Sequence, residues 1–168
     1  PNITVNSASY YVEIRMKVNV SNFDGYWLLY LCEGDAVSGE SSYMSLTEST
    51  DWVTKKLHVD QFSSQPGPSV IGSIRISFRL YPGVKLAAYV DYLRIAQADS
   101  FGWQHDGSTL TGVLGIDDQS DWNIDVTTDG DILTFNMTRI GSGSDYWCDI
   151  RFPIESDGTG SGADDTDI

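Results

Sequence analysis

Aromatic side chains are the residues of this sequence whose chemistry is easiest to foresee, because the chain contains five tryptophans and nine tyrosines. The face of an aromatic ring packs against the apolar side of a sugar ring, and polar neighbours hydrogen-bond its hydroxyls. Trp103 lies in the polar stretch 101–106, so we predict that it is an exposed sugar-binding platform in a loop. Four further aromatic residues are candidates for the same role: Trp147, Tyr26, Tyr43 and Tyr81.

Clustered aspartates point to a second chemistry, the binding of a structural calcium ion by hard oxygen ligands. Asp117, Asp118 and Asp121 lie close together, and Asp129-Gly130-Asp131 follows them. Neither cluster has the spacing or the closing glutamate of an EF-hand loop. A calcium site and an ordinary solvated turn therefore both remain open.

Hydrolytic chemistry finds little support in the sequence. His58 and His105 are the only histidines, and neither belongs to a recognisable metal or triad motif. Carboxylates are numerous enough for a glycosidase pair. The small size of the chain and an internal repeat, described below, nevertheless favour a protein that is not an enzyme.

The charge of the chain excludes some partners. Acidic residues outnumber basic ones by 24 to 10, which gives a net charge of −14 and opposes binding to nucleic acid or anionic lipid. No apolar run is long enough to span a membrane. Asn2, Asn19 and Asn136 each begin an Asn-x-Ser/Thr sequon, which is compatible with an extracellular or cell-surface glycoprotein.

The elements that must position these residues are β-strands. Residues 10–18, 26–32, 74–80 and 89–95 are apolar or alternate between apolar and polar, at least in part, and helical periodicity is absent. Further strands are predicted near 41–47, 52–59, 110–116, 121–127, 131–139 and 146–154, with turns at 22–25, 65–68, 81–83 and 129–131. About ten short strands predict an all-β, antiparallel two-sheet sandwich. Trp27, Trp52 and Trp122 neighbour apolar strand residues and are expected in its core.

Three segments resemble the later half of the jelly-roll carbohydrate-binding modules that accompany glycoside hydrolases. They are Asp51–Asp60 with its tryptophan and closing aspartate, Ile71–Phe78, and the closing strand Ala88-Tyr89-Val90-Asp91-Tyr92-Leu93-Arg94-Ile95. Residues 101–103, 121–122 and 129–135 resemble the opening of such a module. The resemblance covers about two thirds of the chain, and its motifs are of moderate specificity.

The resemblance implies a jelly-roll-like fold and a structural calcium ion near Asp91, which matches an aspartate that often holds calcium in that family. An ordinary hydrogen-bonded strand aspartate is the alternative. The resemblance also implies a division of the chain, in which residues 1–97 form the later part of a sandwich module. Residues 98–155 complete the same sandwich or open the next repeat, and 156–168 form an acidic, Gly/Ser-rich tail or linker.

An internal similarity favours the tandem arrangement. Asn2-Ile3-Thr4 with 10–16 resembles Asn136-Met137-Thr138 with 146–152, and chance convergence of two amphipathic strands is the alternative. The similarity places Cys148 where Val12 stands, and Cys32 lies on the strand expected to follow. Two interpretations of the cysteines remain open. They form a Cys32–Cys148 disulfide, within one chain or between neighbouring chains, or they are two buried thiols.

Two functions from different classes follow, of which the sequence favours the first and keeps the second as the alternative. The first is a non-catalytic, extracellular repeat unit that builds a surface layer or filament with neighbouring copies of itself, by strand donation or edge pairing. The second is a carbohydrate-binding module that attaches an enzyme or adhesin to polysaccharide. The internal repeat favours the first function, whereas the closing strand and the exposed aromatic residues favour the second.

Overall fold

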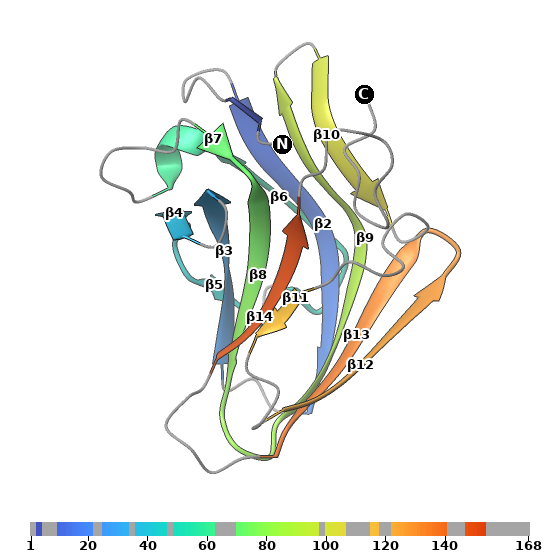
Figure 1. Ribbon diagram of the computed structural model, residues 1–168. Coiled ribbons are helices and arrows are strands. Elements are labelled where there is room, and N and C mark those ends of the chain that lie inside the picture. Colours follow the sequence, from blue (N-terminus) through green and yellow to red (C-terminus); the bar gives the residue numbers. More distant parts are fainter. Residues whose placement is uncertain are drawn as a thin grey trace.

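Two antiparallel β-sheets packed face to face form the fold (Figure 1). The computed structural model describes residues 3–4, 10–21, 25–33, 36–46, 49–62, 70–97, 100–106, 115–117, 122–140 and 147–153. Within these ranges no residue is α-helical, and η2 (Val59–Gln61) is a 3-10 turn. No helix of the described residues is long and apolar enough to cross a membrane. The expected all-β, two-sheet sandwich is confirmed.

The two large sheets each contain six of the described strands. Sheet I has the order β12-β13-β9-β2-β6, with β10 also paired to β9. Its strands are β2 (Tyr10–Val20), β6 (Val53–His58), β9 (Lys85–Gln97), β10 (Ser100–Asp106), β12 (Trp122–Asp129) and β13 (Ile132–Arg139). Sheet II has the order β11-β14-β8-β3-β4, with β5 also paired to β3. Its strands are β3 (Gly25–Glu33), β4 (Ala36–Glu40), β5 (Met44–Ser45), β8 (Ser73–Leu80), β11 (Gly115–Asp117) and β14 (Trp147–Pro153). A small third sheet pairs β1 (Ile3–Thr4) with β7 (Val70–Ile71).

The chain order makes the sandwich jelly-roll-like. Successive strands cross from one sheet to the other at β2–β3, β8–β9 and β13–β14, and their partners match across the sandwich. In sheet I, β9 pairs with β2 and β13; in sheet II, β8 pairs with β3 and β14. The strands of 98–155 therefore belong to the same two sheets as those of 1–97.

Alternation of apolar and polar residues builds the core between the sheets. On β2, Val12, Ile14, Met16 and Val18 are buried in one continuous cluster with residues of the facing sheet, among them Trp27. Because neighbouring residues of a strand point to opposite faces, the residues between them lie on the outer face of the sheet. Each sheet thus presents one face to the core and one outward.

A β-bulge interrupts this alternation on β9. Arg15 of β2 pairs with Tyr92, but the next residue, Met16, pairs with Val90, so Asp91 is an extra residue on β9. Val90 and Leu93 remain buried on the core side, and the two residues between them both face outward. The bulge explains why the sequence 89–95 alternates only in part.

Several expected elements differ from those observed. Among residues 41–46 only the two-residue strand β5 is found, whereas 110–114 lie outside the described residues and 115–117 form β11. Strands β4 and β10 were not predicted, because their sequences AVSGE and SFGWQHD lack an apolar alternation. The turns at 81–83 and 129–131 are confirmed, with Gly83 and Gly130 at positive φ.

Candidate functional site

The outer face of sheet II carries a row of residues from separate strands. Tyr26 on β3 pairs in register with Arg79 on β8, and Arg79 pairs with Trp147 on β14. Trp27 and Phe78, the neighbours of Tyr26 and Arg79, are core residues. Tyr26 and Arg79 therefore point outward, and the Trp147 side chain lies outside the described residues.

Arg79 lies among three tyrosines on this face. Its Nη1 donates a hydrogen bond of 2.5 Å to the hydroxyl of Tyr26, and its guanidinium carbon lies 5.4 Å from the centre of that ring. The rings of Tyr26 and Tyr43 pack with centroids 4.4 Å apart and planes tilted by 47°. The Tyr26 hydrogen bond raises the pKa of Arg79 above its ordinary value, and electrostatic interactions with Tyr43 and Tyr81 add to this effect. We call Tyr26, Tyr43, Arg79 and Tyr81 the tyrosine–arginine cluster.

The cluster is open to solvent. Among the described residues, three large apolar side chains are exposed. They are Tyr43 (61% exposed), Tyr81 (47% exposed) and Ile140. Tyr81 follows β8 directly and begins a turn in which the Val84 amide donates to the Tyr81 carbonyl at 3.2 Å. Pro82 and Gly83 occupy the middle of that turn, as a type II turn requires. The turn holds Tyr81 beside Arg79.

A second polar row adjoins the cluster. Ser77 on β8 pairs with Asp149 on β14, and the Ser77 hydroxyl donates a hydrogen bond to the Asp149 carboxylate. Arg75, two residues further along β8, forms an ion pair with the same carboxylate at 3.6 Å. Aromatic faces, a guanidinium and a carboxylate therefore occur together on this face of sheet II, and such a set can bind a ligand with both apolar and hydroxyl-bearing surfaces.

Trp103 does not lie in a loop, contrary to expectation. It belongs to β10 and pairs with Ile95 of β9, next to a register shift between Phe101 and Trp103. Glycine, glutamine and histidine around Trp103 led to the expectation of a loop, but backbone pairing to the long strand β9 overrides these weak local preferences. Its side chain lies outside the described residues, so its role as a sugar platform stays a prediction.

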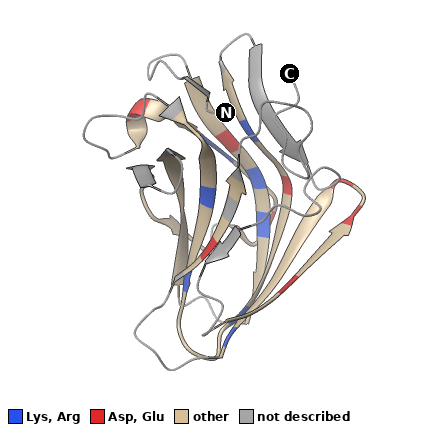
Figure 2. Ribbon diagram, viewed as in Figure 1, with Lys and Arg blue, Asp and Glu red and all other residues tan. Residues whose placement is uncertain are grey.

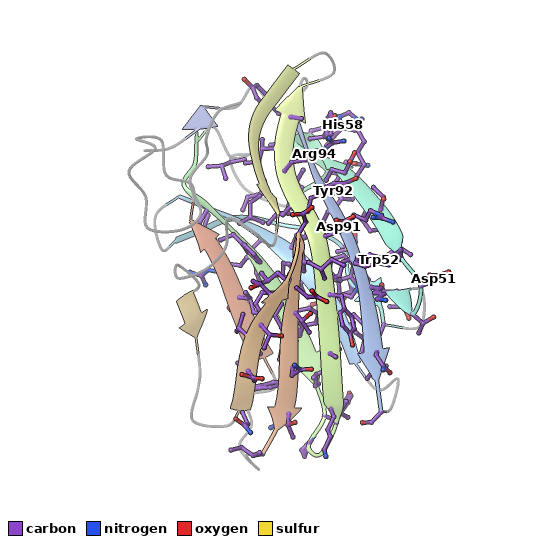
Figure 3. All side chains as sticks on the ribbon, turned by 90° about the vertical axis from the view of Figure 1, so that its right-hand side faces the viewer. Asp51, Trp52, His58, Asp91, Tyr92 and Arg94 are labelled. Carbon is purple, nitrogen blue, oxygen red and sulfur yellow. The ribbon has the colours of Figure 1, made fainter. Side chains whose placement is uncertain are left out.

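The outer face of sheet I is organised by ion pairs instead. Figure 3 shows Asp91, Tyr92 and Arg94 following one another along β9. Arg94 donates to the Glu13 carboxylate at 2.5 Å, and the Tyr92 hydroxyl donates to the same oxygen at 2.7 Å. Burial and then the hydrogen bond to Glu13 raise the pKa of Tyr92 above its ordinary value near 10. Both side chains hold Glu13, whose carboxylate is nearly buried.

Asp91, the calcium candidate, binds a protein cation. Its carboxylate accepts a hydrogen bond from Arg15 and forms an ion pair with it. A calcium ion at Asp91 would compete with this guanidinium. In the part of the chain that the structure describes, no group of three or more His, Cys, Asp or Glu side chains is arranged to hold a metal. Asp117 lies on β11, but its side chain is outside the described residues. Asp118 and Asp121 lie outside the described residues altogether. Calcium at these positions stays a prediction.

Trp52 is not a core residue, in contrast to Trp27 and Trp122. It precedes β6, on which alternate residues face outward, and its ring lies on the outer side of sheet I (Figure 3). The guanidinium of Arg15 and the ammonium of Lys17 lie 4.8 and 5.0 Å from the ring centre. Figure 2 shows basic positions along β2, the strand that carries Arg15 and Lys17. Cation–π contact with two basic side chains accounts for an outward tryptophan.

Two of the three sequons lie among the described residues. Asn19 and Asn136 are both exposed, on β2 and β13, and they flank Ala87 of β9 in register. Asn2 lies outside the described residues. Glycosylation of these three asparagines stays a prediction.

The two cysteines are buried, but no disulfide joins them. Cys32 pairs with Ser73 and Cys148 with Phe78, on opposite sides of β8. Their Cα atoms are thus roughly 19 Å apart, and a disulfide needs less than about 7 Å. Cys148 also faces the core, whereas Cys32 does not belong to it. The intrachain Cys32–Cys148 bond considered from the sequence is therefore wrong, and burial opposes a bond between neighbouring chains.

The two similar segments of the sequence occupy different sheets. β2 lies between β6 and β9 in sheet I, and β14 lies between β8 and β11 in sheet II. Both nevertheless alternate alike: Val12 and Cys148 face the core, and Glu13 and Asp149 each bind an arginine of the neighbouring strand. Shared strand chemistry accounts for this likeness within one sandwich, and a tandem array stays a prediction.

No protein-family model matches the sequence, and the comparison with curated proteins found no match.

Proposed function

We propose that this sandwich is a non-catalytic, extracellular carbohydrate-binding module whose ligand lies on the outer face of sheet II. The tyrosine–arginine cluster carries the proposal. Three tyrosines that the sequence offers as sugar-binding candidates lie on this face: Tyr26 binds Arg79, Tyr43 packs on Tyr26, and Tyr81 follows two residues after Arg79.

The geometry suits saccharide binding in two ways. The exposed rings of Tyr43 and Tyr81 offer apolar faces for the C–H side of a pyranose, at little cost in conformational entropy. The hydrogen bond to Tyr26 orients Arg79, which places a guanidinium, a multiple hydrogen-bond donor, beside the aromatic rings. Asp149, held by Ser77 and Arg75, supplies an acceptor nearby.

A glycan panel with matched variants tests the proposal. Tyr43→Ala and Tyr81→Ala should each weaken binding by about tenfold, equivalent to about 1.4 kcal/mol. Tyr43→Phe keeps the ring and should bind like the wild type. Arg79→Met keeps most of the packing and should weaken binding through lost hydrogen bonds. Melting temperatures should change little, because both tyrosines are exposed. A wild-type protein without glycan binding, or alanine variants that bind as well as it, would contradict the proposal.

A surface-layer or filament unit is the second candidate, favoured by the edge of sheet I. β12 pairs with β13 on one side, and no other described strand pairs with its opposite side. An open edge of this length can accept a strand from a neighbouring copy. Negative-stain electron microscopy of the native protein distinguishes the two candidates: ordered filaments favour assembly, and monodisperse particles exclude it.

A further inference from the structure

A hollow lies on the outer face of sheet I, in the opposite sheet from the tyrosine–arginine cluster. Ala87 on β9 forms its floor and pairs in register with Asn19 of β2 on one side and with Asn136 of β13 on the other. Both asparagines are exposed, and two strand spacings place their Cα atoms about 10 Å apart. An alanine between two longer side chains lets a ligand approach the sheet.

Two grooves meet at Asn19. One has a volume of 340 Å³, and its polar lining comes from Asn19, Ser21, Lys85, Asn136 and Thr138. The other has a volume of 270 Å³, and its polar lining comes from Lys17, Asn19, Thr50 and Tyr89. Carboxamides and hydroxyls both donate and accept hydrogen bonds, as sugar hydroxyls require.

Lys17 places a positive charge at the second groove. Its ammonium lies 5.0 Å from the ring centre of Trp52 and 4.9 Å from that of Tyr89. Contact with two aromatic faces restricts the long side chain, so an anion that binds there loses less conformational entropy. A fixed ammonium beside hydroxyl and amide groups is suited to a carboxylate.

The distribution of ion pairs distinguishes Lys17 from the arginines around it. Among the described residues, Arg15 and Arg94 on this face each bind a carboxylate. No carboxylate of the described residues binds Lys17 or Lys85, although the chain carries a net charge of −14. Asp125 on β12 pairs with Asn136 and places a negative charge beyond that end of the hollow. A negative ligand is therefore favoured at the other end, near Lys17.

We propose that this hollow binds a carboxylated sugar residue of an acidic polysaccharide. Lys17 holds the carboxylate, and Asn19 and Asn136 bind the hydroxyls over Ala87. Lys85 closes the groove on the far side of Asn19. The site is independent of the tyrosine–arginine cluster.

Calorimetric titration with polygalacturonate, and with the same polymer methyl-esterified, tests the proposal. The wild type should bind polygalacturonate and not the neutral ester, because the ester offers no carboxylate to Lys17. Lys17→Gln should weaken binding at least tenfold. Lys56→Gln is the matched control, because it removes the same charge from the same face, where Lys56 lies 3.5 Å from the Tyr11 ring centre. Ala87→Leu should abolish binding by filling the hollow, with an unchanged melting temperature.

Three outcomes would overturn the proposal: equal binding of both polymers, an equal loss in Lys17→Gln and Lys56→Gln, or full binding by Ala87→Leu. The intact mass of protein from its native host is a further test, since a glycan on Asn19 or Asn136 would cover the hollow. Arg79→Met should bind polygalacturonate like the wild type. Failure of the sheet II proposal is thereby distinguishable from failure of this one.

Discussion

Asp91 binds Arg15 at the one position where the register between β9 and β2 shifts. The extra residue of the bulge turns Asp91 outward beside Tyr92, so two consecutive side chains of β9 reach the same face. Asp91 meets Arg15 there, and Tyr92 meets Glu13. The bulge thus creates a pair of adjacent polar contacts that a regular strand would place on opposite faces.

Replacing Asp91 tests what this carboxylate holds. Asp91→Ala should lower the free energy of unfolding by about 1 kcal/mol, because both partners are partly exposed and the pair is screened by solvent. Because Arg15 already supplies a cation to this carboxylate, we expect Asp91→Ala to leave the response of the melting temperature to a chelator unchanged. A chelator-sensitive melting temperature that Asp91→Ala abolishes would show instead that calcium binds at Asp91.

The raised pKa of Tyr92 leads us to expect a loss of stability at alkaline pH. Its pKa is raised in the folded state, so the folded protein favours the neutral phenol more than the unfolded chain does. The stabilisation is complete below the ordinary pKa near 10 and is lost as pH rises through the higher folded pKa. Urea unfolding between pH 8 and pH 11 should show a decline that is smaller in Tyr92→Phe. An identical decline in both proteins would assign the effect to other groups.

Gly25 should tolerate no side chain. Its φ is +144°, and a Cβ there would lie 2.3 Å from the backbone oxygen of Arg79. Gly25→Ala should therefore lower the free energy of unfolding by about 3 kcal/mol or more, since both strain and a backbone clash contribute. Gly130→Ala is the control: its φ is also positive, but nothing lies within 4 Å of a Cβ, and about 1 kcal/mol is expected. Equal losses in the two variants would show that the close approach at Arg79 has no energetic weight.

The stability of the protein should not depend on a reductant. Cys32 and Cys148 are buried and lie far apart on either side of β8, so dithiothreitol should change neither the melting temperature nor the electrophoretic mobility. Both thiols should react with a thiol reagent only after unfolding. A reductant-dependent melting temperature would contradict the register of β3 or β14.

The fold could be predicted from the sequence where alternation is regular. Residues 10–18 and 74–80 show it plainly, and each forms a central strand of its sheet. Residues 36–40 and 100–106 were missed because they pair at the edges of longer strands, where backbone hydrogen bonds replace side-chain burial. The bulge at Asp91 also cannot be predicted from the sequence, because one extra residue changes the phase of alternation without changing the composition.

The candidate sites were predictable only in part. Tyr26, Tyr43 and Tyr81 were chosen for their residue type, but their meeting at Arg79 depends on pairing between strands far apart in the chain. Outward alternation on 74–80 identified Arg79 as a surface position without indicating its neighbours. Trp52 was assigned to the core because an apolar ring beside a strand usually is buried, and the two cations of β2 that cover it cannot be inferred from local sequence.

The nested strand order has a consequence for synthesis. Val12 of β2 pairs with Ile95 of β9, and Trp27 of β3 with Phe78 of β8, so one neighbour of each of these strands is made much later in the chain. Ribosomes add about 5–20 residues per second, so the edge of β2 that pairs with β9 stays unpaired for several seconds. Contacts so distant in the chain also close slowly. We therefore expect the nascent chain to depend on chaperones until β9 emerges, and truncation before β9 should yield aggregates rather than a smaller folded unit.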